Sequence, residues 1–138
     1  MWHFTKLYVS TLASFVALDA IWLGILMPGF YKTEFGSLAR RQGDALTPIL
    51  WAMLAVYLML PLGVIWFVLP RLSEANRLSS SALWGFVFGL FTYGIYDLTN
   101  YATLNGYSLR LVSVDMLWGG VICGVSTIVA AALDRWFS

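Results

Sequence analysis

The sequence predicts an all-α integral membrane protein, a bundle of four transmembrane helices that forms a single domain over residues 1–138. Two observations support this prediction. The chain is 60% hydrophobic and only 11% charged, whereas a soluble domain averages about 45–50% apolar and about 25% charged residues. In addition, four apolar runs each approach the roughly 20 residues that a helix needs to cross the hydrocarbon core. We expect helices at about 6–27, 47–69, 81–104 and 110–133.

Proline and glycine set the limits of the first two helices. The first run ends at Pro28, and the second begins after Thr47 with Pro48, a residue favoured in the first helical turn. The second run stops at Pro70. Pro61 lies inside it and is expected to kink the helix, because proline lacks the N–H that bonds the preceding turn.

Turn residues likewise separate the last two helices. Serines 79–81 precede the third helix, and Asn105-Gly106 forms a tight turn into the fourth, so these helices are expected to make an antiparallel hairpin. The stretches 85–89 and 120–124 each begin and end with glycine, a pattern that allows close helix packing and would also support self-association. Apolar residues at roughly helical spacing in the 28–46 loop predict an interfacial helix between the first two spans.

Charge and residue counts exclude several classes of site. Eight basic against seven acidic residues leave no basic surface for nucleic acid. The single histidine, His3, argues against a metal or haem centre built on histidines, and no cofactor is predicted. The single cysteine, Cys123, excludes an internal disulfide. Both termini lie on one side of the membrane. Each side carries four Lys or Arg residues, so the positive-inside rule gives no orientation.

Three aspartates lie inside the predicted spans: Asp19, Asp97 and Asp115. At the centre of a membrane helix an aspartate costs about 2.5–3.5 kcal/mol, so intramembrane carboxylates are functional candidates. At about 1.5 Å per residue, all three lie about 8–12 Å from the same helix ends, on the side of the 28–46 loop. Three carboxylates from three helices in one layer predict a shared site.

Polar and aromatic neighbours complete the predicted pocket, which is expected to open toward the 28–46 loop. The candidate ligand-binding residues are Asp19, Asp97, Asp115, Asn100, Tyr93, Tyr96, Thr99, Trp22, Trp118 and Arg110. The Asp-x-x-Trp pattern occurs twice, at 19–22 and at 115–118, in helices that run in opposite directions. The alternative interpretation is structural, with the aspartates serving only to hold the helices together.

The segments Asp97-Leu-Thr-Asn100 and Val114-Asp-x-x-Trp-Gly119 closely resemble a bacterial family of small predicted membrane proteins, domain of unknown function 2177. The resemblance extends over essentially the whole chain. It implies a four-helix, multi-pass protein of the bacterial inner membrane, in contact with membrane lipid. It implies no activity.

Three functions fit these residues. The first is binding or transport of a proton, a cation or a lipid-like small molecule, because carboxylates in an aromatic pocket attract cations. The second is an accessory subunit of a larger membrane complex, or a homodimer. The third is a lipid-modifying enzyme with paired aspartates as general acid and base, so whether the protein is an enzyme stays open.

Overall fold

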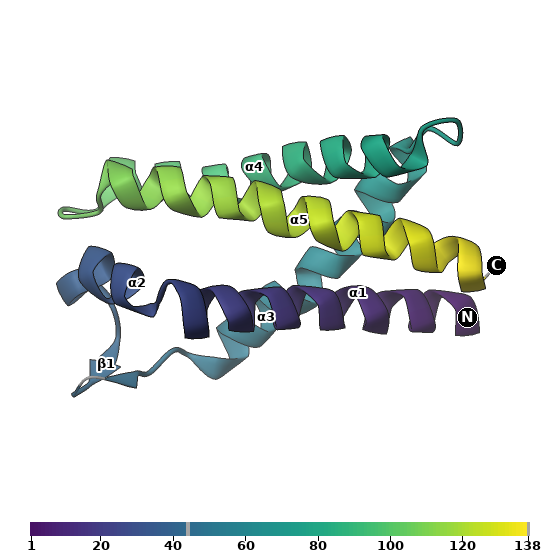
Figure 1. The fold of residues 1–138 in the computed structure, drawn as a ribbon. Coiled ribbons are helices and arrows are strands. Elements are labelled where there is room, and N and C mark those ends of the chain that lie inside the picture. Colours follow the sequence, from purple (N-terminus) through teal and green to yellow (C-terminus); the bar gives the residue numbers. More distant parts are fainter. Residues whose placement is uncertain (44, 138) are drawn as a thin grey trace.

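The computed structural model describes residues 1–43 and 45–137. Over these residues the chain is mainly helical, and four helical stretches are long and apolar enough to cross a membrane (Figure 1). The protein is therefore a four-helix membrane protein, as the sequence predicts. The four spans are Trp2–Leu26, Leu50–Arg71, Arg77–Thr103 and Leu109–Phe137.

Each span contains one main helix, and two spans end in a distorted segment. The elements are, in chain order, α1 (Trp2–Ile21) with the π-helical η1 (Trp22–Leu26), α2 (Pro28–Phe35) with the 3-10 turn η2 (Gly36–Leu38), β1 (Arg41–Gln42), β2 (Ala45–Leu46), α3 (Leu50–Gly63) with the π-helical η3 (Val64–Val68) and the 3-10 turn η4 (Leu69–Arg71), α4 (Arg77–Thr103) and α5 (Leu109–Phe137). The first helix begins nearer the N-terminus than the apolar run alone indicated, and the last helix continues further.

A short helix follows α1, where the sequence predicted one. Pro28 occupies the first turn of α2, where its missing N–H leaves no hydrogen bond unmade. Gly36 has a φ of 45° at the end of this helix, a conformation that glycine adopts at little steric cost. The chain then forms the antiparallel pair β1–β2, in which Arg41 faces Leu46. This segment returns the chain to the membrane at the start of α3.

Glycines bring α4 and α5 into close antiparallel contact along their length (Figure 1). A Cβ atom added at Gly89 would lie 1.9 Å from the backbone oxygen of Gly119, and one added at Gly85 would lie 2.7 Å from the backbone oxygen of Cys123. Gly120 and Gly124 on α5 are buried as well. Both glycine patterns are thus used within the helical hairpin, and their faces are not free to pair with a second copy of the chain.

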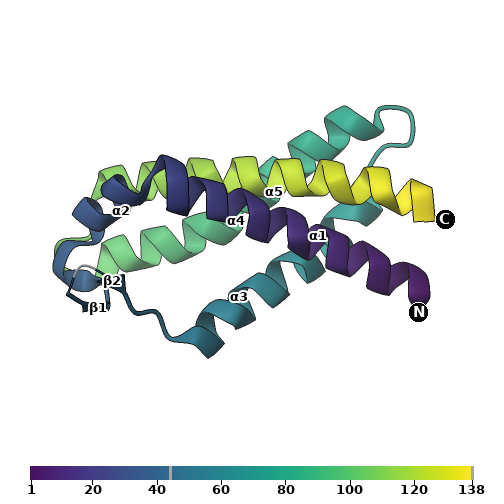
Figure 2. The same ribbon diagram turned by 60° about the horizontal axis from the view of Figure 1, so that its bottom comes forward.

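Pro61 marks the point at which the third span changes direction. It removes the N–H that would bond the carbonyl of Tyr57, and two residues later α3 gives way to the π-helical segment η3. Tyr8 on α1 donates its hydroxyl to the carbonyl of Leu58 at 3.0 Å, one turn before the proline, and so joins the first span to the third. As a result η3 packs on α4, whereas α3 leans on α1 and diverges from α4 (Figure 2).

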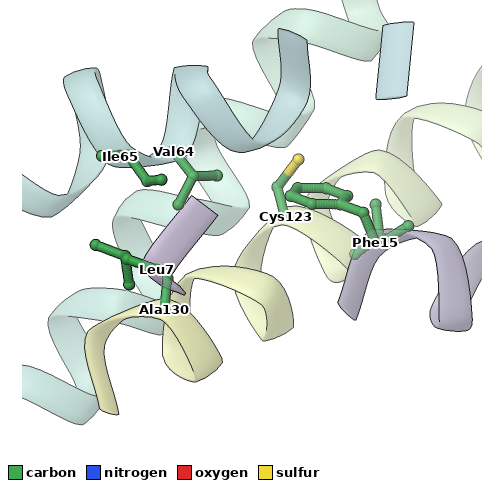
Figure 3. Close-up of a cluster of buried hydrophobic side chains, with 7 residues drawn as sticks. Leu7, Phe15, Val64, Ile65, Cys123 and Ala130 are labelled. Carbon is green, nitrogen blue, oxygen red and sulfur yellow. The ribbon is translucent and has the colours of Figure 1, made fainter. Parts of the chain in front are cut away.

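The apolar core lies where α1, η3 and α5 meet. Phe15, Val64 and Cys123 are fully buried there, and Leu7 and Ala130 extend the core toward the termini (Figure 3). Because lipid tails are as apolar as these side chains, the core is stabilised mainly by close packing rather than by exclusion of water.

An ion-pair network joins three helix ends beside the termini. Asp134 on α5 accepts hydrogen bonds from His3 at 2.9 Å and from Arg77 at 2.8 Å. Glu74 pairs with Arg77 and, at 3.3 Å, with Arg135. The network fixes the first turns of α1 and α4 against the last turn of α5. The two termini therefore lie together at one end of the bundle (Figure 1).

Candidate functional site

Hydrogen bonds to Asp19 join three of the spans. Its side chain is 8% exposed, and each carboxylate oxygen accepts one hydrogen bond. Trp118 of α5 donates its indole N–H to Oδ1 at 2.8 Å, and Tyr57 of α3 donates its hydroxyl to Oδ2 at 2.9 Å. Asp19 is thus buried with both oxygens bonded, which is the condition for holding a carboxyl group in an apolar interior.

The repeated Asp-x-x-Trp pattern has a geometric explanation. Trp22 and Trp118 each lie one turn beyond an aspartate, on antiparallel helices, and their rings stack with centroids 4.3 Å apart and an interplanar angle of 3°. The indole of Trp118 bonds to Asp19. The indole of Trp22 donates to the hydroxyl of Tyr31 at 2.9 Å, and that hydroxyl donates to Asp115. The stacked tryptophans therefore connect the two aspartates crosswise.

Asp115 accepts a hydrogen bond from α2, which lies outside the spans. Tyr31 on α2 is almost fully buried and donates its hydroxyl to Oδ1 of Asp115 at 2.5 Å, a short distance typical of a hydrogen bond to a carboxylate. Burial raises the pKa of Tyr31, and the negative charge of Asp115 raises it further. The tyrosine hydroxyl therefore keeps its proton and acts only as a donor to this carboxylate.

Asp97 is fully buried and interacts with Asp115. Tyr107, in the turn between α4 and α5, donates its hydroxyl to Oδ1 of Asp97 at 2.6 Å. Burial raises the pKa of Tyr107, and the hydrogen bond to Asp97 adds to the shift. Oδ2 of Asp97 has no donor among the described residues. The carboxyl groups of Asp97 and Asp115 are close enough to interact, and one proton placed between them would satisfy the unbonded oxygen of Asp97.

The structure thus brings Asp19, Asp97 and Asp115 together in one network, which we call the aspartate cluster. Trp22 and Trp118 belong to it through the hydrogen bonds and the ring stacking described above. Tyr93 is half-buried and lies within electrostatic range of Asp19 and Asp115.

The other predicted site residues lie at the edge of the cluster or outside it. Tyr96 is exposed on one side and contacts Asn100 and Tyr107. Thr99 is exposed on α4. Arg110 is also exposed, pairs with Glu34 at 3.4 Å and lies over the ring of Phe30. The same Glu34 accepts a hydrogen bond from Ser108, so this group attaches α2 to the start of α5.

Sequence reasoning did not assign three tyrosines to the site: Tyr31, Tyr57 and Tyr107. Each donates to one of the aspartates. Tyr57 carries a signal that could have been used, because its hydroxyl falls in the middle of an apolar run and needs a partner there. Tyr31 and Tyr107 lie outside the spans, and only the folding of α2 and of the α4–α5 turn brings them to the carboxyl groups.

A cavity of about 730 Å³ extends from the aspartate cluster between the third span and α4. We call it the groove. Asp115, Tyr93 and Tyr96 lie at one end, and most of the remaining wall is apolar, including Val56, Met59, Trp66, Phe67 and Phe88. The expected opening toward the 28–46 segment is wrong. Tyr31 and Tyr107 pack with Leu111 and Val112 in a buried cluster there, and the space lies instead where α3 diverges from α4.

The donor set of the cluster is made of carboxyl groups, phenols and indoles. Among residues 1–43 and 45–137, no three His, Cys, Asp or Glu side chains come close enough together to hold a metal ion. Carboxyl groups connected in this way within the spans can each hold a proton or complement a positive charge.

Residues 4–132 match the family described as predicted membrane protein, domain of unknown function 2177. The chain belongs to this family. The matched region of this family member contains all three aspartates and the five side chains that donate hydrogen bonds within the cluster. No curated protein and no solved structure matches the chain.

Proposed function

We propose that this family member binds, and carries through the membrane, a proton, a cation or a lipid-like small molecule at the aspartate cluster. The observation that carries the proposal is the meeting of three carboxyl groups from three spans, with Asp115 also lining the groove. We further propose that the protein is a multi-pass protein of a bacterial inner membrane.

The distribution of charge supports a cationic ligand. In the sequence no Lys, Arg or His occurs within 7–31, 45–70, 78–109 or 111–134. No basic side chain from the middle of a span can therefore neutralise the cluster. Burying several unpaired negative charges is unfavourable by several kcal/mol for each ion. The compensating charge must come from protons or from a bound cation, and exchange between the two is the elementary step of a proton-coupled carrier.

The volume of the groove also supports a small-molecule ligand. Sites for drug-sized ligands occupy about 300–1,000 Å³ and combine apolar walls with a few polar groups. The groove has this volume and this composition. If the groove had only apolar walls, lipid tails would be its simplest occupants.

The test uses tetraphenylphosphonium, a permanent lipophilic cation, with the purified protein in lipid nanodiscs. We expect this cation to raise the unfolding temperature of the wild-type protein and of Asp134→Asn, and to have no effect on Asp115→Asn. Asp134→Asn is a matched control, because it removes a carboxylate at the opposite end of α5. Equal shifts for all three proteins, or no shift for any, would refute the binding of a lipophilic cation at the cluster.

An accessory, structural role is the second candidate, and Asp19 favours it. Both oxygens of Asp19 are bonded to donors on other spans, as in a residue that holds helices together. In this case Asp19→Asn and Asp115→Asn would lower stability without changing the binding of any cation.

A further inference from the structure

The groove is open toward lipid rather than toward water. Val56, Met59, Trp66 and Phe67 line it and are each more than half exposed. All four lie within the span Leu50–Arg71, where the surroundings of an exposed side chain are hydrocarbon. A ligand therefore reaches the groove sideways from the bilayer, between α3 and α4, where these two helices diverge (Figure 2).

The groove is also long and has one polar end. From Val56 to Phe67 the third span extends about 16 Å, at about 1.5 Å per residue. Asp115 and Tyr96 lie at the polar end of the groove, whereas Trp66, Phe67 and Phe88 lie further along it. An extended apolar chain with one polar head group matches this shape, with the head at Asp115.

The groups around Asp115 determine the chemistry of that head. Tyr31 on α2 already donates to it, and the carboxyl groups of Asp97 on α4 and Asp19 on α1 are close enough to act on it electrostatically. Tyr93 and Tyr96 face it from α4. The groups that act on Asp115 are thus acidic or neutral. A head group with positive charge and N–H donors would complement them, and an anionic head would be repelled.

We propose that the groove binds a single-chain primary amine from the bilayer, with its ammonium group on Asp115, and that binding displaces one proton held between Asp97 and Asp115. This inference rests on the proposed function and names its substrate class. The ammonium ion enters with its charge, the carboxylic acid releases one proton to water, and both aspartates are then carboxylates beside one cation. Binding and proton release are therefore stoichiometric.

The first test is photolabelling with dodecylamine that carries a diazirine on its chain, using the protein in nanodiscs. We expect labelling of peptides from 56–67, at least fivefold weaker in Asp115→Asn and in Val56→Trp, which fills the groove. Leu54→Trp is the matched control, because Leu54 is exposed on α3 and does not line the groove. The same probe with an alcohol or carboxylate head should label the groove weakly. Equal labelling by all three heads would overturn the proposal.

The second test measures proton release into weakly buffered solution when dodecylamine is added. We expect release from the wild type and none from Asp97→Asn, in which no carboxyl pair shares a proton. Binding of the amine without proton release from the wild type would overturn the exchange step. If tetraphenylphosphonium binds in an Asp115-dependent manner and dodecylamine does not, this inference fails and the proposed function stands.

Discussion

The contact between Gly89 and Gly119 allows a quantitative test of the α4–α5 hairpin. In Gly89→Ala the new methyl group would lie 1.9 Å from the Gly119 oxygen and 2.8 Å from the Gly120 Cα. These are backbone atoms, so no side chain can rotate away and the helices must separate. Overpacking of an interior typically costs about 1–3 kcal/mol. We expect a loss of about 3 kcal/mol, because relief requires movement of a whole helix.

The assay is reversible unfolding in mixed micelles, followed by tryptophan fluorescence. Gly24→Ala is the control, because its added Cβ would meet nothing within 4 Å. Gly124→Ala should be intermediate, because its nearest contact, the Ala82 oxygen, lies at 3.3 Å. The free energy of unfolding should therefore fall in the order Gly24→Ala, Gly124→Ala, Gly89→Ala. Equal stabilities for Gly24→Ala and Gly89→Ala would refute the packing described here.

Three further predictions concern the cluster, α2 and the topology. Trp118→Phe removes the N–H donated to Asp19 and should lower the free energy of unfolding by about 1–2 kcal/mol. In the same assay the control Trp51→Phe should change it by less than about 0.5 kcal/mol, because Trp51 is exposed. Ser108→Ala removes the hydroxyl that accepts the Leu111 N–H at 3.0 Å, and it should lower the free energy of unfolding, measured by thermal unfolding, by about 1 kcal/mol. The matched variant Ser113→Ala should show no such loss. Reporters fused to the two termini should lie on the same side of the membrane, and readings from opposite sides would contradict four spans.

The sequence was sufficient for the four spans, because these follow from the cost of polar groups in hydrocarbon. Backbone groups there must be bonded within a helix, so long apolar runs predict helices directly. Asp19, Asp97 and Asp115 were expected to share a site because all three lie at a similar depth below the same helix ends. It is harder to predict which side of each helix packs on its neighbours, because a helix that is apolar all round gives no signal for that side.

Thr99 and the groove illustrate this limit. Thr99 lies two residues from Asp97, and residues at this spacing on a helix do not share a face, so its exposure could have been expected. The groove could not have been predicted, since it depends on the angle near Pro61 between α3, which diverges from α4, and η3, which packs on α4. The contact between Tyr107 and Asp97 could not have been predicted either, because the chain that follows Asn105-Gly106 can leave the turn in more than one direction.

The hydrogen bonds of Asp19 have a consequence for biosynthesis. Its donors Tyr57 and Trp118 follow it by 38 and 99 residues. At about 5–20 residues per second, Trp118 is synthesised about 5–20 s after Asp19. During that interval the first span must enter the bilayer with an aspartate that lacks its indole donor, at a cost of about 2.5–3.5 kcal/mol. The first helix is therefore the one whose retention in the membrane depends most on the insertion machinery, until synthesis of the last span supplies the missing donor.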